Sequence, residues 1–545
     1  MAHLFPALLA RLRRGLRLPP SGWALAGMLT FYVVAGLVGR DPWKGEDAIH
    51  LGTTWHILAH GDWLSPGLAG HPFSEPPLYY WSAALTGKLL GWLLPLHDAM
   101  RFASGIWVAL ALVGVYYAGR ELHGQESAAA SPLLLAGSAG LIVHAHDAQP
   151  FLVALAAYGG GLGAMAAFGR KPRLAGGLYG AALAACLLGT GFAPTLPLLI
   201  AGPLAAFLSP EPRRAWRTCL LGWLLFALLA APWPLALTLL EPESLNSWLT
   251  AEWAQFGQGD ALVRAIAGYL GMLPWFAFPT LPIAAWWLWA NRDRLRERPV
   301  VLPLLLFALT LVLLVFVHRP KELPALLLLP PLALLATPGS LALRRGAANA
   351  FDWFSIMTFS FFVGLVWFGW SALALGWPER LAKRTVVLRP GFVGHFEPLA
   401  VTIAVLGTLW WIWLMVTSPR SSYRSLTHWT MGFTIFWLLA TLLWLPWFDY
   451  GKSYRPVAVA IARLLPATGA CLAERDLTDT QRASFAYFTG IEPLPLAGNA
   501  GRKCDWLLVQ GDSRRELAAP QGGWSLAWEG ARPGERRERF RLYRR

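Results

Sequence analysis

Long apolar stretches alternate with short polar or basic connectors from Trp23 to Phe448. Stretches of about 17 to 22 apolar residues recur, each long enough to cross a hydrocarbon core of roughly 30 Å as a helix. From position 449 onward the pattern changes to frequent charges and short strand-like runs, without a spanning stretch. We therefore expect an all-α polytopic membrane domain over 1–448 and a small soluble α/β domain over 449–545.

The basic residues occupy the connectors between these stretches. The formal net charge of the 545 residues is +15, and its carriers lie in short clusters such as 11–17, 170–173, 213–217 and 292–298. Placing all the basic clusters on one side of a membrane satisfies the positive-inside rule. The charge is thus explained by orientation, and we expect no nucleic-acid partner.

If all the basic connectors lie on the same side of the membrane, the chain must cross it an even number of times between one basic connector and the next. Between Arg17 and Arg120 there are three apolar stretches, 22–39, 78–95 and 99–118, so one does not cross. We assign 78–94, which contains Lys88, to a helix in the outer interface. About thirteen spans remain, with the N-terminus inside and the tail outside: 22–39, 99–118, 127–143, 150–168, 174–188, 193–208, 218–239, 268–290, 300–317, 323–340, 353–376, 397–417 and 428–448.

This topology gathers acids and bases from separate loops at the outer face. The first outer loop, 40–98, contributes Glu46, Asp47, His71 and Glu75, and Tyr80 follows shortly after. A second loop contributes Asp147, and a third contributes His318, Arg319 and Lys321. Such convergence is typical of an external active site with an entrance from the lipid.

Each group also has a structural explanation. Glu46 and Asp47 could belong to a solvated loop or the first turn of a helix, where acids are favoured. The cluster at 318–321 could be a polar turn, although cations on the outer side run against the positive-inside bias and favour a phosphate ligand. The two outer cysteines, Cys471 and Cys504, could form a disulfide.

The residues resemble one family. A first span, an acidic pair and then HGDWLSPGLAGHPFSEPPLYYW at 60–81 are similar to the GT-C class of polyprenyl-phosphate-sugar-dependent glycosyltransferases, in the bacterial branch with the lipid A aminoarabinose transferase and the protein O-mannosyltransferases. Further similar runs are AAPWPLAL at 230–237, LPWFAFP at 273–279 and HRPKELPALLLLPPLALL at 318–335. The resemblance covers roughly residues 20–340, and beyond them only the topology is similar.

The resemblance implies inverting transfer of a sugar from an undecaprenyl-phosphate donor to a lipid A, glycan or protein acceptor, at the periplasmic face of a bacterial inner membrane. It implies that Glu46 takes the family's catalytic aspartate position and Asp47 its neighbour, and either could be the base. The implied substrate-binding residues are His71, Glu75, Tyr80, Asp147, His318, Arg319 and Lys321.

Two positions depart from the family pattern. Glu75 stands where the family has a lysine thought to meet the donor phosphate, and Thr190 replaces a second lysine. A carboxylate repels phosphate unless a cation intervenes. Phosphate binding could have moved to Arg319 and Lys321, or to a divalent cation held by acids such as Glu46, Asp47 and Asp147; otherwise no cofactor is implied.

The alternatives are a non-catalytic member of the family that acts as a membrane binding or assembly protein, and a transporter. A transporter is expected to place ionisable residues near the middle of its spans and to consist of two related halves. Here the ionisable residues lie at the outer ends of the spans and no repeat is evident.

Overall fold

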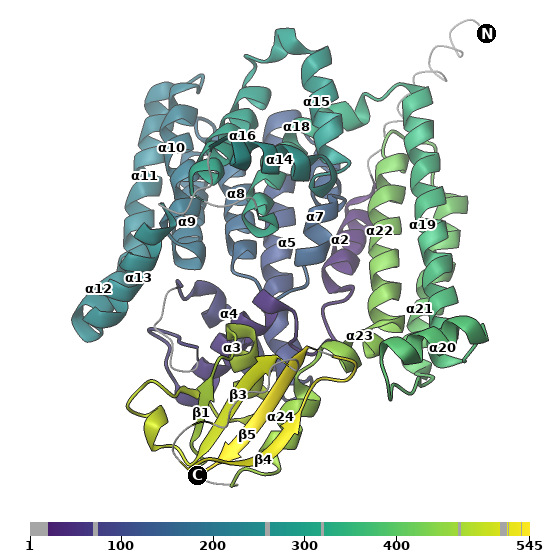
Figure 1. The fold of residues 1–545 in the computed structure, drawn as a ribbon. Helices are drawn as coiled ribbons and strands as arrows, with labels where there is room; N and C mark the ends of the chain where they lie inside the picture. Colours follow the sequence, from purple (N-terminus) through teal and green to yellow (C-terminus); the bar gives the residue numbers. More distant parts are fainter. Residues whose placement is uncertain are drawn as a thin grey trace, which may run out of the picture.

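A bundle of apolar helices carries a small β-sheet at one end (Figure 1). The computed structural model describes residues 20–68, 75–256, 262–317, 321–466, 470–512, 520, 523–535 and 537–545. In Figure 1 the helix axes run mostly in one direction, and the sheet lies beneath them beside α3 and α4. The expected helical membrane domain with a C-terminal α/β unit is therefore confirmed.

Within the described residues, eight helical segments are long and apolar enough to cross a membrane. They are α5 (Leu96–His123), α9 (Pro172–Thr190), α11 with α12 (Pro212–Ala230 and Pro232–Leu240), α16 (Arg298–Val317), α17 to α18 (Glu322–Leu341), α19 (Arg345–Ala374), α21 (Pro398–Thr417) and α22 (Arg424–Leu443). A ninth would consist of α14 (Leu262–Phe276) and α15 (Thr280–Ala290), which meet at 103°.

The other expected spans are shorter or broken. Three are apolar helices of under 18 residues: α2 (Gly22–Val34), α8 (Phe151–Ala167) and α10 (Phe192–Phe207). The range 127–143 is split into α6 (Ala130–Ala136) and α7 (Ala139–His144). Every one of the thirteen expected ranges thus contains helix, while eight or nine segments meet the length and composition of a complete crossing.

Several shorter helices lie between the spans or between the last span and the sheet. They are α3 (Gly45–His60), α4 (Leu78–Leu90), α13 (Pro242–Gln255), α20 (Glu379–Leu388), α23 (Leu445–Lys452) and α24 (Arg455–Ala462). The expected helix at 78–94 is confirmed over Leu78–Leu90, and its place in the outer interface stays a prediction.

The basic connectors converge at the end of the bundle away from the sheet. Arg170 and Lys171 both bind the Glu121 carboxylate near the end of α5, at 2.8 and 2.7 Å. The Arg298 guanidinium donates to the Met165 carbonyl at 3.0 Å. Because α5 has 28 residues, this cluster lies about 40 Å along the helix from its first residue, Leu96. Basic residues of the connectors at 170–171 and 298 therefore lie at the same end of the bundle, and the orientation of that end in a membrane stays a prediction.

The C-terminal unit is a mixed sheet in the order β2-β1-β3-β5-β4. Its strands are β1 (Leu472–Arg475), β2 (Leu494–Pro495), β3 (Trp506–Asp512), β4 (Ser525–Gly530) and β5 (Glu538–Arg544). β1 is parallel to β2 and β3, whereas β5 is antiparallel to β3 and β4. The disulfide between Cys471 and Cys504, which the sequence left open, is present, with Cα atoms 4.8 Å apart.

The sheet unit is held closely against the first outer loop. Helix α25 (Asp479–Thr489) packs on α3, and a Cβ built at Gly52 would lie 2.6 Å from the Ala483 Cβ. Arg455 forms an ion pair with Asp41, and the Ser484 hydroxyl donates to the Pro42 carbonyl at 3.2 Å. Contacts from the tail therefore help to position α3, the helix that begins with the acidic pair.

Candidate active site

The acidic pair occupies the first turn of α3, where carboxylates interact favourably with the helix dipole. Neighbouring residues on a helix point about 100° apart, so the two side chains have different environments. The Asp47 side chain is fully buried, whereas the Glu46 side chain is 58% exposed. This difference separates the two residues that the sequence left as equal candidates for the base.

Asp47 is the centre of a buried charge network. Its carboxylate accepts two hydrogen bonds from Arg101, at 3.0 and 2.7 Å, and one from the Ala148 backbone amide at 2.7 Å. The Arg40 guanidinium lies 3.2 Å from Asp47 and donates to Asp147 at 2.7 Å. The network joins α3 to α5 and to the loop after α7.

The same network keeps both aspartates ionised. Burial alone would raise the pKa of Asp47, but the nearby charges of Arg101 and Arg40 hold that pKa well below its ordinary value. The charges of Arg40 and Lys44 likewise outweigh burial and lower the pKa of Asp147. A carboxylate whose oxygens already accept several donors is a weak base, so the geometry favours Glu46 over Asp47 as the group that could accept a proton.

Beside this network lies a pocket of about 220 Å³. Its walls are formed by the start of α3, by 149–151, by the junction of α9 and α10, by α13 and by 321–324. The ionisable side chains that line it are Glu46, His50, Glu75, Glu252 and Lys321. Segments far apart in the sequence thus bring three carboxylates, an imidazole and an ammonium group to one cavity.

A chain of polar contacts runs along one wall of the pocket. The Tyr80 hydroxyl donates to the Glu75 carboxylate, and His50 Nδ1 lies 2.8 Å from the Tyr80 oxygen. Because the Tyr80 proton is directed to Glu75, the His50 Nδ1–H is the donor in that second bond. His50 Nε2 then faces Glu46 Oε2 at 3.7 Å. Tyr80 and His50 therefore link the two exposed acids, Glu75 and Glu46, in one chain of contacts.

Glu252 is the buried acid of the pocket. One of its oxygens accepts from the Phe192 backbone amide at 2.9 Å, at the start of α10. Gly191 leaves room for the carboxylate, since a Cβ there would lie 1.9 Å from Glu252 Oε1. Burial raises the pKa of Glu252 to about 7, so this carboxyl is protonated in about half of the molecules near neutral pH.

The predicted site residues fall into three groups. Glu46, Glu75 and Lys321 line the pocket, and Tyr80 contacts two residues that line it. Asp47 and Asp147 belong to the adjacent network. His71, His318 and Arg319 lie outside the described residues.

Several residues of this region were not predicted from the sequence. Arg40, Lys44 and Arg101 hold the network, and Glu252 enters the pocket from helix α13, which is distant in the sequence. Arg101 could have been predicted from the sequence, since an arginine within an apolar stretch needs a buried partner. Glu252 could not, because only the tertiary fold brings α13 to the pocket.

The proposed metal ligands do not assemble. In the part of the chain that the structure describes, Glu46, Asp47 and Asp147 form no metal-ligating group. Arg40 binds both aspartates, and Lys44 binds a second oxygen of Asp147 at 2.5 Å. These cations occupy the oxygens that a metal ion would need.

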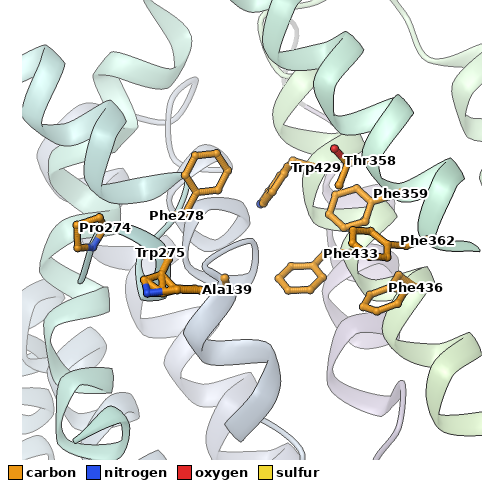
Figure 2. Close-up of a pocket in the computed structure, with 10 residues that line it drawn as sticks. All are labelled: Ala139, Pro274, Trp275, Phe278, Thr358, Phe359, Phe362, Trp429, Phe433 and Phe436. Carbon is orange, nitrogen blue, oxygen red and sulfur yellow. The ribbon is translucent and has the colours of Figure 1, made fainter. Parts of the chain in front are cut away.

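A larger cavity elsewhere is apolar. It has a volume of about 480 Å³ and lies between side chains of 139 and 274–278 and those of α19 and α22 (Figure 2). Phe278 and Trp275 face Trp429, Phe359 and Phe433 across it. None of its lining residues is ionisable, so it offers no acid or base for chemistry.

Comparison with known structures identifies the architecture. The chain superimposes on the crystal structure of ArnT from Cupriavidus metallidurans bound to undecaprenyl phosphate with a TM-score of 0.69 and 18% identity, covering 96% of this chain and 98% of that one. The apo form of the same protein gives a TM-score of 0.68 at 17% identity, covering 95% and 96%. The chain has the ArnT fold.

Sequence comparison agrees with this assignment. No protein-family model matches the chain. It is 29% identical over 316 residues to undecaprenyl phosphate-alpha-4-amino-4-deoxy-L-arabinose arabinosyl transferase 1 of Sodalis glossinidius, covering 53% of this chain and 55% of that one. An enzyme of the same name from Pseudomonas aeruginosa strain PAO1 is 31% identical over 316 residues, covering 51% and 53%. The match to the Pectobacterium atrosepticum enzyme is 26% identical over 407 residues, covering 70% and 68%.

The chain therefore resembles the ArnT group in sequence and shares its fold, as the motifs of the first outer loop implied. The match to the first of these relatives spans about half of that protein's length.

Proposed function

We propose that the chain is an inverting glycosyltransferase that moves a sugar from an undecaprenyl-phosphate donor to an acceptor, with lipid A as the first candidate. The observation that carries this proposal is the position of Glu46, whose half-exposed carboxylate faces a polar pocket while its neighbour Asp47 is held by Arg101 and Arg40. The ArnT fold and the names of the relatives support it.

Glu46 is the proposed base. In the reaction the acceptor oxygen attacks the anomeric carbon and gives its proton to a carboxylate, while the bond from that carbon to the phosphate oxygen breaks and undecaprenyl phosphate leaves. A group that takes this proton must be reachable from the substrate and have a free lone pair. Glu46 meets both conditions, whereas the oxygens of Asp47 are occupied.

The cationic contribution to phosphate binding comes from Lys321 in this proposal. Lys321 lines the pocket, and Glu75 and Thr190, which stand at the two lysine positions of the family, line it too. A leaving phosphate is stabilised by a nearby ammonium group and destabilised by a carboxylate. Tyr80 holds Glu75 by a hydrogen bond, and a proton on Glu252 reduces the negative charge of the pocket.

We place this site at the periplasmic face of a bacterial inner membrane, with the N-terminus in the cytoplasm. The sheet unit and the pocket residues of α3 share the end of the bundle away from the basic connectors, which supports that orientation. The proposed boundary between the membrane domain and the tail is at 448/449, within α23.

A second reading, a non-catalytic member that binds a membrane partner, has one observation in its favour. The pocket contains Glu75 and Thr190 where the family has lysines, and three carboxylates face one ammonium group among its described lining residues. Loss of both lysines weakens electrostatic recognition of a phosphate.

Sugar transfer by membranes that contain wild type or Glu46→Gln decides between the two readings. The donors are radiolabelled undecaprenyl-phosphate sugars, and label is followed into lipid, glycan and protein fractions. We expect Glu46→Gln to lower the rate by about 10² to 10⁴, the usual contribution of a general base. The matched control is Glu379→Gln, which removes a carboxylate that is 77% exposed on α20 and should transfer at the wild-type rate.

Equal transfer by Glu46→Gln and wild type would remove Glu46 from the mechanism. No transfer above background by the wild type with any donor would favour the non-catalytic reading. Expression and the melting temperature of each variant in detergent separate a chemical loss from a folding loss.

A further inference from the structure

Two histidines of α3 and an acid of the tail meet outside the candidate active site. His56 and His60 are four residues apart and therefore lie on the same face of the helix. Glu492, in the segment between α25 and β2, reaches the same place. Ligand atoms of the three residues all lie within 4.8 Å of one another.

We propose that His56, His60 and Glu492 bind a divalent transition metal ion, with zinc as the first candidate, and that this ion ties the tail to α3. Imidazole nitrogen and carboxylate oxygen are the ligands that zinc and related metals accept, and three protein ligands leave one position for water. This proposal does not rest on the proposed transferase activity.

Two of the three distances between ligand atoms are near those of a tetrahedral site. Bonds of about 2.0 to 2.1 Å from zinc place neighbouring ligand atoms about 3.4 Å apart. His60 Nε2 lies 3.4 Å from Glu492 Oε1. His56 Nδ1 lies 2.5 Å from the same oxygen, which is hydrogen-bond distance, and would move away by less than 1 Å when an ion enters.

The surroundings supply the outer contact that metal-binding histidines usually have. With Nδ1 of His56 directed at the ion, its Nε2 points to the Asp62 carboxylate at 3.8 Å. A carboxylate that accepts from the distal nitrogen fixes the ring orientation and strengthens the ligand. The His60 side chain is half exposed, and His56 and Glu492 are each 17% exposed, so an ion can reach the site from solvent.

The position gives the ion a structural consequence. His56 and His60 lie on the helix whose first turn holds Glu46 and Asp47, and Glu492 belongs to the tail. An ion that binds the docked arrangement and not the undocked one stabilises docking by mass action. Metal would thus strengthen the contact between α3 and α25.

The test uses the full chain in detergent, purified with an affinity tag that contains no histidine and stripped with a chelator. Zinc is added alone, excess is removed, and the metal retained per protein is measured. We expect about one zinc per wild-type chain and a loss of affinity of at least tenfold in His60→Ala, the variant that disturbs packing least because its side chain is half exposed. His395→Ala, which removes an exposed histidine from another loop, should retain zinc as the wild type does.

A second readout addresses the docking role. Zinc should slow proteolysis of the 449–545 tail in wild type and in His395→Ala, and should have no effect in His60→Ala. Cobalt substituted into the wild type should give the intense visible absorption of a tetrahedral site. Equal zinc retention in wild type and His60→Ala would overturn the proposal, and so would a wild type that keeps no zinc; the His56–Glu492 contact would then be an ordinary ion pair.

Discussion

At the scale of single residues, burial gives two adjacent acids different properties. Asp47 is enclosed by Arg101, Arg40 and a backbone amide, and its lowered pKa follows from those partners. Glu46 keeps a free edge toward the pocket. The two environments differ because the two side chains leave the first turn of α3 in different directions.

Removal of Arg101 should be strongly destabilising. The guanidinium is fully buried and binds both Asp47 and Asp98, so Arg101→Met leaves two buried carboxylates without their main partner. We expect a loss of about 3 to 5 kcal/mol, the usual cost of breaking a buried ion pair. Thermal unfolding in detergent measures it, and Arg294→Met, which breaks an exposed pair with Glu297 at the opposite end, should leave the melting temperature unchanged. A small effect of Arg101→Met would mean that Arg40 compensates.

Glu252 should make stability depend on pH. Its pKa is raised from 4.5 to about 7 by burial, so folding favours the neutral acid. Its contribution to stability is complete below pH 4.5 and is lost as the pH rises through 7, by an amount on the order of 3 kcal/mol. Glu252→Gln should therefore match the wild type at pH 5 and unfold at a higher temperature than the wild type at pH 8. If the melting temperatures of wild type and Glu252→Gln differ by the same amount at pH 5 and pH 8, the ionisation of Glu252 does not lower the stability of the protein.

At the scale of elements, the contact between α3 and α25 joins the helix of the acidic pair to the tail. The two helices approach so closely that Gly52 has no space for a methyl group beside Ala483. Close approach of this kind depends on small residues on both sides.

Gly52→Ala should loosen this contact. Overpacking of a tight interface costs about 1 to 3 kcal/mol. We expect faster hydrogen exchange in α25 of the variant, and only a partial return toward wild-type exchange in the double variant Gly52→Ala with Ala483→Gly, because the new Cβ would still lie 2.9 Å from the Cα of residue 483. Gly27→Ala on α2 is the matched control, because a Cβ there meets no atom within 4 Å. If the double variant exchanges as fast as Gly52→Ala alone, the helices separate for another reason.

At the scale of the whole molecule, the basic connectors and the pocket lie at opposite ends of the bundle. Arg170 and Lys171 bind Glu121 at one end, and the three acids and the histidine of the pocket lie at the other, near the sheet. The positive-inside rule predicts that the end with the basic connectors is the cytoplasmic one.

Single cysteines can test the orientation. A membrane-impermeant maleimide should label Glu397→Cys in intact cells, and should label Arg213→Cys only after the inner membrane is opened. Both positions are exposed, and the two native free cysteines, Cys186 and Cys219, are buried and should remain unlabelled. The reverse pattern of labelling would invert the proposed topology.

The sequence by itself determined the helical membrane architecture and the presence of a small α/β unit at its C-terminal end. These features follow from local hydropathy, from composition and from the placement of charges along the chain, which need no knowledge of long-range contacts. It also located Glu46, Glu75, Tyr80 and Lys321 around one site, through motifs that lie within short segments.

Tertiary structure decided how those residues work. Arg40 and Arg101 meet Asp47 only because the first loop folds back on α5, and Glu252 reaches the pocket only because α13 packs against the junction of α9 and α10. Burial then set which carboxylates are ionised and which one remains free. Burial and distance between remote segments are properties of the packed chain, so no local pattern in the sequence could have specified them.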